Sequence, residues 1–139
     1  LATQMGADMT VDVCKDDYGT ALLDWTDGRG PDVVIEAVGT AATVRHAFEL
    51  AAHAGRVVVL GIVAEDIAVP GQVLVRKELD VFGSRMNARL FPDVLRLLQA
   101  GSVDPRPFIT HSFPLENAVE ALQLARDNPE EAVKVLLLP

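Results

Sequence analysis

The sequence lacks several features that mark common classes of protein. It holds a single cysteine, Cys14, which excludes an internal disulfide and a metal site built from cysteines alone. Its 12 Lys and Arg residues stand against 20 Asp and Glu residues, and the net charge of −8 offers no basic patch for nucleic acid. No apolar run approaches the roughly 20 residues that span a membrane. We therefore expect a cytoplasmic protein that binds neither nucleic acid nor a membrane.

Motifs that carry chemistry on their own are also missing. The chain contains no Gly-x-Gly-x-x-Gly, no phosphate-binding P-loop, no His-Glu-x-x-His and no Gly-x-Ser-x-Gly. Its histidines form no metal site, because His46 and His53 lie seven residues apart on the polar face of one predicted helix and His111 lies far along the chain. We interpret His111 as a structural residue beside the final strand. The sequence therefore predicts neither a catalytic residue nor a metal ligand.

What the chain does contain is a pair of apolar segments that end in glycine. Half of the residues are hydrophobic and only 5% are aromatic, which is typical of an α/β protein rich in Ala, Val and Leu. The stretch Pro31–Gly39 contains the β-branched run Val33–Ile35, and Arg56–Leu60 leads in the same way into Gly61. Such runs are typical of strands covered on both faces of a parallel sheet, and a helix predicted over 41–53 joins them. The predicted fold class is therefore α/β with a parallel sheet.

The rest of the pattern extends this alternation and then breaks it. We expect these further elements in chain order: the end of a helix over 1–5 closed by Gly6, a short strand over 9–13, a helix along Tyr18–Trp25, one or two helical turns over 71–77, a strand over 79–83, a helix from Pro92 to Gly101, an extended segment over 108–113, a helix after Pro114 and a strand over 133–138. Because a proline-rich connector covers 104–107, we predict domains over 1–102 and 103–139. A helix end needs a helix before it, so we expect a fragment of a longer chain.

Three strand ends are the candidates for a ligand site. They are Glu36-Ala37-Val38-Gly39, Gly61-Ile62-Val63 and Gly83-Ser84-Arg85-Met86. Ligands bind at the carboxyl edge of open α/β sheets, where backbone groups at glycine can read an amide on a flat ring that lies against small apolar side chains. The alternative is that each glycine only turns the chain. Glu36 either orients a ligand hydroxyl, pairs with a basic group, or is a structural carboxylate hydrogen-bonded to loop amides; we favour the structural role.

Taken in order, these segments resemble a known family. The matching pieces are Gly6-Ala7-Asp8, Gly28–Gly39, Gly55–Gly61, Lys77–Ser84 and Ile109-Thr110-His111. Over essentially the whole chain they resemble the C-terminal portion of zinc-containing alcohol dehydrogenases of the medium-chain dehydrogenase/reductase superfamily. The polyol and sugar-acid branch, near the sorbitol, threonine and galactonate dehydrogenases, is the most similar. In that family a Rossmann domain that binds NAD or NADP is inserted into a GroES-like catalytic domain, to which the last part of the chain returns.

The resemblance implies cofactor contacts that all follow the three strands. The residues concerned are Ala37, Val38, Gly39, Gly61, Ile62, Val63, Ser84, Arg85 and Met86. The first three would flank the adenosine–ribose side of the cofactor and the next three would lie by the nicotinamide ring. Ser84 and Met86 would contact the carboxamide through their backbone, whereas Arg85 would meet a phosphate or a substrate carboxylate, or only solvent. Family dimers join their sheets near 79–83, so we expect a homodimer or tetramer.

The resemblance also places much of the machinery outside this chain. The glycine-rich phosphate loop, the first two strands, the acidic residue that holds the ribose and all zinc ligands would precede Leu1. In the family, zinc polarises the alcohol oxygen as a Lewis acid while hydride passes to the nicotinamide. We assign that chemistry, on an alcohol or polyol, to the full-length parent and expect the segment alone to be inactive. The alternatives are a zinc-free quinone or enoyl reductase, and a non-catalytic oligomerisation or binding module without a pocket at this edge.

Overall fold

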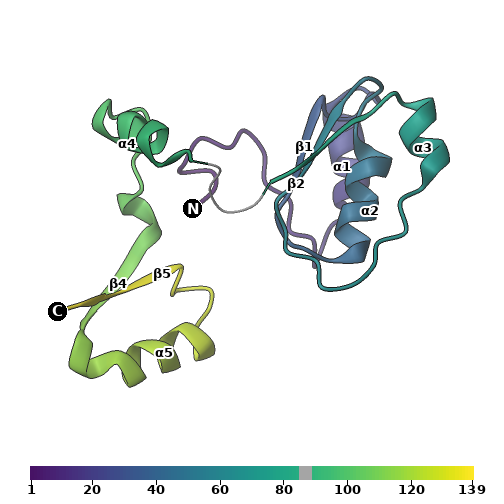
Figure 1. Cartoon of the computed structure of the whole chain (residues 1–139). Coiled ribbons are helices and arrows are strands. Elements are labelled where there is room, and N and C mark those ends of the chain that lie inside the picture. Colours follow the sequence, from purple (N-terminus) through teal and green to yellow (C-terminus); the bar gives the residue numbers. More distant parts are fainter. Residues whose placement is uncertain (85–88) are drawn as a thin grey trace. The chain divides into compact units, whose positions relative to one another are not determined.

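The computed structural model describes residues 1–84 and 89–139 and divides the chain into two compact units (Figure 1). One unit comprises residues 10–88, and the other comprises residues 1–9 and 89–139. The first contains α1 (Tyr18–Trp25), β1 (Val33–Glu36), α2 (Ala41–Leu50), β2 (Arg56–Val59), α3 (Gly71–Arg76) and β3 (Asp80–Gly83). The second contains α4 (Phe91–Gln99), η1 (Arg106–Phe108), β4 (Ile109–Pro114), η2 (Leu115–Asn117), α5 (Ala118–Asp127) and β5 (Lys134–Leu138). Among the described helices, none is long and apolar enough to cross a membrane.

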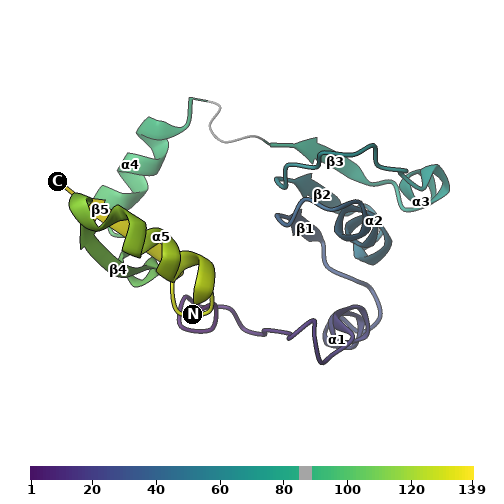
Figure 2. The same ribbon diagram turned by 90° about the horizontal axis from the view of Figure 1, so that it is seen from below.

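The first unit is built on a parallel sheet in the order β1–β2–β3, which confirms the predicted α/β class. The register places Val34 beside Val57 and Glu36 beside Val59. Helix α2 connects β1 to β2 and lies along one face of both strands, as Figure 2 shows. Its first turn is fixed by a reciprocal pair of hydrogen bonds, in which the side chains of Thr40 and Thr43 each accept the other's backbone N–H.

The core of this unit lies between α2 and the sheet. Val44 and Phe48 on α2 are 2% and 3% exposed, and Val57 on β2 is fully buried. The opposite face of β1 is open, since Val33 and Ile35 are 42% and 61% exposed. Among the described residues, the expectation of cover on both faces is therefore not met at β1, although the α/β class with a parallel sheet holds. The side chains of α2 and α3 pack on the face that carries Val34 and Val57, and in the described part of the chain the other face of β1 has no such layer.

Predictions near the amino end also need correction. Residues 9–13 form no strand, because a strand needs a hydrogen-bonded neighbour and the sheet of this unit begins at β1. Residues 1–5 form a single turn rather than a helix, with the N–H of Met5 donating to the carbonyl oxygen of Leu1 at 3.0 Å. Gly6 does close this turn with a φ of +98°, as a glycine after a helix end is expected to do.

The second unit contains a smaller sheet in which β4 and β5 run parallel, joined through η2 and α5. Ala121 of α5 is buried against this pair at 3% exposure. Helix α4 begins with a proline in its first turn, as predicted from Pro92. Its apolar stripe is exposed, with Phe91 at 63% and Leu95 at 54%. The division at residue 103 concerns the complete protein and stays a prediction.

Candidate cofactor-binding site

The carboxyl ends of β1 and β2 lie side by side, and the loops that follow them touch at two glycines. A Cβ atom added to Gly61 would lie 2.3 Å from the nitrogen and 2.4 Å from the Cα of Gly39. One added to Gly39 would lie 2.9 Å from the nitrogen of Ile62, and Gly39 also has a φ of +85°. Only glycine allows the two backbones to approach so closely. The structure thus brings together the loops 37–39 and 61–63, as predicted from their place in the sequence.

Large apolar side chains stand exposed beside this glycine contact. Val38 is 72% exposed and Ile62 is 76% exposed, and Ala37 is exposed next to Val38. Val63 instead is partly buried and packs against the core, which anchors the 61–63 loop. Exposed apolar side chains next to glycine backbone form a surface against which a flat ring can lie while its polar groups meet main-chain atoms.

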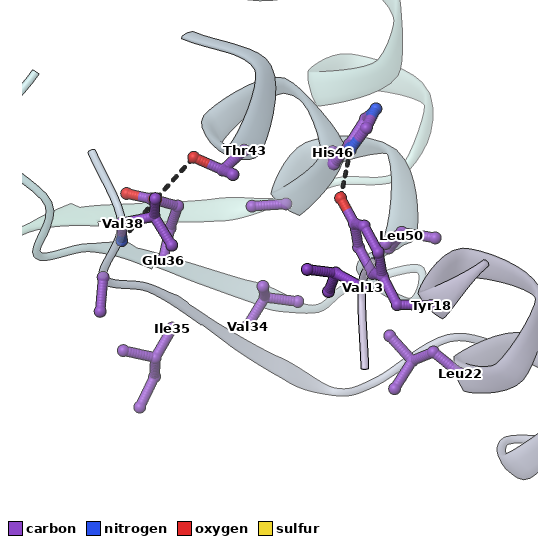
Figure 3. Close-up of a pocket in the computed structure, with 12 residues that line it drawn as sticks. Val13, Tyr18, Leu22, Val34, Ile35, Glu36, Val38, Thr43, His46 and Leu50 are labelled. Atoms are coloured by element: carbon purple, nitrogen blue, oxygen red, sulfur yellow. Dashed lines mark hydrogen bonds between the residues drawn. The ribbon is translucent and has the colours of Figure 1, made fainter. Parts of the chain in front are cut away.

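Glu36 lies beneath the contact, at the end of β1. It is only 5% exposed, and its Oε1 accepts hydrogen bonds from the N–H groups of Val38 at 2.9 Å and Gly39 at 2.8 Å. The hydroxyl of Thr43 donates to the same oxygen at 2.8 Å (Figure 3). Burial raises the pKa of Glu36, but these hydrogen bonds and the nearby N–H of Gly61 outweigh it and hold the pKa below the ordinary value of a glutamate. The favoured sequence interpretation, a structural carboxylate bonded to loop amides, is confirmed.

The third predicted strand end is described only in part. Ser84 directly follows β3 and is exposed, and its N–H donates to the carbonyl oxygen of Val59 at 3.0 Å. A ligand at this edge would therefore meet the carbonyl oxygen or the hydroxyl of Ser84 before its N–H. Arg85 and Met86 lie outside the described residues, so their predicted contacts remain predictions.

A cavity of about 430 Å³ lies between α1, β1 and α2, with Val38 at one end (Figure 3). Its wall is mainly apolar, and the hydroxyl of Tyr18 pairs there with Nδ1 of His46. Burial raises the pKa of Tyr18, and the charges of Asp17 and Glu49 raise it further. Sequence reasoning missed this contact, although His46 is exposed, as its place on the polar face of the helix predicted. The only signal for it was an aromatic residue on the apolar stripe of α1, and the two partners lie 28 residues apart.

Zinc does not fit the described residues. In the ranges 1–84 and 89–139, no three His, Cys, Asp or Glu side chains are grouped so as to hold a metal ion. His111 on β4 packs against Phe113 with ring centroids 6.5 Å apart, and its Nδ1 lies 3.1 Å from the hydroxyl of Thr110. We therefore assign no zinc ligand to the described residues. The joined glycine loops, with exposed apolar side chains at the carboxyl edge of a parallel sheet, fit a dinucleotide.

A parallel α/β sheet whose strands end in touching glycine loops defines a partial domain of the Rossmann class. Comparison with known families gives a narrower result. Residues 1–100 match the family model described as zinc-binding dehydrogenase, and the chain belongs to that family. The resemblance seen in the sequence is thereby confirmed.

Relatives and solved structures agree with this assignment. The erythritol/L-threitol dehydrogenase of Mycolicibacterium smegmatis is 32% identical over 100% of the chain, and the L-threonine 3-dehydrogenase of Bacillus licheniformis is 34% identical over 100%. An alcohol dehydrogenase of Escherichia coli CFT073, complexed with NADH, covers 99% of the chain at 31% identity with a TM-score of 0.91. Alcohol dehydrogenase TADH of Thermus sp. ATN1 covers 99% at 32% identity, with a TM-score of 0.89. The chain spans 38% of the first of these proteins and 40% of each of the other three.

Proposed function

We propose that this chain is the C-terminal, cofactor-domain portion of a zinc-dependent alcohol or polyol dehydrogenase that transfers hydride from a secondary alcohol to NAD or NADP. The observation that carries the proposal is the contact between Gly39 and Gly61 at the carboxyl ends of two paired parallel strands. Membership of the zinc-binding dehydrogenase family and the NADH complex of one structural neighbour support it.

The residues of this chain bind and orient the cofactor in this proposal. When bound, the dinucleotide supplies the hydride acceptor. The exposed side chains of Val38 and Ile62 lie against its apolar surfaces, and the backbone at Gly39 and Gly61 comes close enough to meet its polar groups. Residues 103–139 return to the catalytic domain of the complete protein, which supplies the zinc ligands. We further propose that the complete protein is a homodimer or tetramer and acts in the cytoplasm.

The names of the relatives suggest which substrates to test. They act, by name, on erythritol or L-threitol and on L-threonine, and each of these molecules carries a secondary hydroxyl group. We therefore propose a small polyol or a hydroxy-substituted amino acid as the substrate class. Oxidation of these compounds by the complete natural polypeptide, followed through reduction of NAD or NADP, tests the proposal directly. Turnover lost to a chelator and restored by Zn²⁺ supports the zinc type, whereas turnover that survives metal removal favours the zinc-free reductases.

A pair of matched variants tests the site itself. Val38→Glu places a negative charge beside the glycine contact, where it repels the phosphates of a dinucleotide. Val75→Glu makes the same change on α3, at a valine that is 74% exposed against 72% for Val38. We expect NADH to bind at least about tenfold more weakly to the first variant, which corresponds to about 1.4 kcal/mol, and unchanged to the second. Equal NADH affinity of both variants, measured by calorimetry, would contradict the assigned site.

A further inference from the structure

The two loops of the candidate site share one anchor, Glu36. On the β1 side, its Oε1 holds the N–H groups of Val38 and Gly39 at 2.9 Å and 2.8 Å. On the β2 side, its main-chain carbonyl oxygen accepts the N–H groups of Leu60 at 2.7 Å and Gly61 at 3.1 Å. Its Oε2 faces the backbone of Gly61, because a Cβ atom added there would lie only 2.6 Å away. Glu36 therefore touches both sides of the glycine contact.

The same carboxylate is tied to the first turn of α2. The Thr43 hydroxyl that donates to Oε1 also accepts the N–H of Thr40 at 3.2 Å, so Glu36 belongs to the network that caps this helix. The ion pairs found in the described residues involve other carboxylates, and none of them reaches Glu36. Its negative charge is stabilised by N–H and O–H donors and by the positive end of the α2 dipole.

We propose that Glu36 is a positioning residue for dinucleotide binding, whose carboxylate fixes the 37–39 loop against the 61–63 loop. This inference rests on the proposed function. Glu36 is too deeply buried to meet the cofactor, and it acts through Val38 and Gly39, which are held at one spacing from Gly61 before a ligand arrives. Such preorganisation strengthens binding because less ordering remains to be done in the complex.

The position favours a carboxylate because three donors converge on Oε1, whereas Oε2 is buried with no hydrogen-bond partner among the described residues. A glutamine offers one carbonyl oxygen and one NH₂ group in the same space. If the oxygen faces Val38 and Gly39, the NH₂ group faces the backbone of Gly61; if it is reversed, the NH₂ group faces three donors. In the first orientation the three donors keep an acceptor but lose its negative charge, and in the second they lose the acceptor, so Glu36→Gln should loosen the two loops while it leaves the volume of the side chain unchanged.

The test compares Glu36→Gln with Glu65→Gln in the complete natural polypeptide. Glu65 is exposed and accepts the N–H of Ala41 at 3.4 Å, so it provides the same chemical change near the same helix. We expect Glu36→Gln to raise the dissociation constant of NADH about tenfold. We expect Glu65→Gln to change it by less than about twofold. In the cofactor-free protein, hydrogen exchange should quicken at residues 37–39 in the first variant alone.

Kinetics separate positioning from a merely structural role. We expect Glu36→Gln to raise KM for the dinucleotide while KM for the alcohol stays unchanged. Loss of active enzyme with both KM values unchanged would instead mean that Glu36 only stabilises the fold, and would overturn the inference. If wild-type protein binds NADH and Glu36→Gln binds it equally, the inference also fails while the proposed function stands. If wild-type protein binds neither NADH nor NADPH, the proposed function itself fails.

A second pair of variants keeps the inference testable if Glu36→Gln does not fold. Thr43→Val removes one of the three donors to Oε1 with little change in shape, and Thr43→Ser retains the hydroxyl. We expect weaker NADH binding and faster exchange at 37–39 in Thr43→Val, and wild-type behaviour in Thr43→Ser. NADH binding and exchange that are the same in both variants would contradict a positioning role for the carboxylate.

Discussion

Helices α2 and α4 have the same kind of sequence pattern but very different surroundings. Both carry apolar residues at the spacing of one helix face, and both are about the same length, with 10 and 9 residues. On α2 that face is buried, with Val44 and Phe48 at 2% and 3% exposure. On α4 it is open, with Phe91 at 63% and Leu95 at 54%. An amphipathic pattern therefore predicts a helix, whereas burial depends on whether another layer is present to cover it.

The two helices also differ in how their ends are held by hydrogen bonds. Thr40 caps the start of α2 through the reciprocal hydrogen bonds with Thr43, while Leu90 at the start of α4 makes no side-chain cap. The end of α2 is held from a distant part of the chain, because Lys77 donates to its last carbonyl groups. Helix α2 is thus held by hydrogen bonds at both ends and by packing along one face. Local and tertiary interactions therefore favour the same structure there.

The largest expected effect comes from truncating the buried face. Phe48→Ala should lower the free energy of unfolding by about 3–5 kcal/mol, because it removes a buried ring and leaves a cavity. Phe91→Ala should cost less than about 0.5 kcal/mol in this chain, because its ring is already in water. Urea unfolding followed by far-UV circular dichroism measures both. Equal costs would mean that the two faces do not differ in cover as the structure indicates.

A smaller effect is expected at the contact between Gly39 and Gly61. Gly61→Ala should lower the free energy of unfolding by about 1–3 kcal/mol, because its Cβ would lie 2.3 Å from the nitrogen of Gly39 and the loops must move apart. Gly71→Ala is the matched control, since a Cβ atom there meets nothing within 4 Å. Fluorescence of Trp25, the single tryptophan, reports unfolding of the same unit. A Gly61→Ala protein as stable as Gly71→Ala would show that the backbones do not touch.

The sequence was sufficient where the signal is local. The β-branched runs and their closing glycines predicted β1, β2 and the meeting of their loops, because parallel neighbours end at one edge. It failed at residues 9–13, where alternation indicated a strand but no hydrogen-bonding neighbour is present in the described sheet. It also failed to indicate the open face of Ile35 and the pairing of Tyr18 with His46. Both depend on which segments meet in space, and neither is encoded in the periodicity of a single segment.

The smallest expected effect concerns the carboxyl end of α2. The Nζ of Lys77 donates to the carbonyl oxygens of Glu49 at 2.5 Å and Ala51 at 2.8 Å. Burial lowers the pKa of Lys77 while the charge of Glu49 raises it, so desolvation offsets part of the gain from these hydrogen bonds. Lys77→Met should therefore cost only about 1 kcal/mol. Arg76→Met, at the neighbouring exposed position, should be neutral when both are compared by Trp25 fluorescence in urea. If Lys77→Met leaves the free energy of unfolding unchanged, Lys77 does not anchor the carboxyl end of α2. The difference between α2 and α4 would then be confined to the buried face of α2.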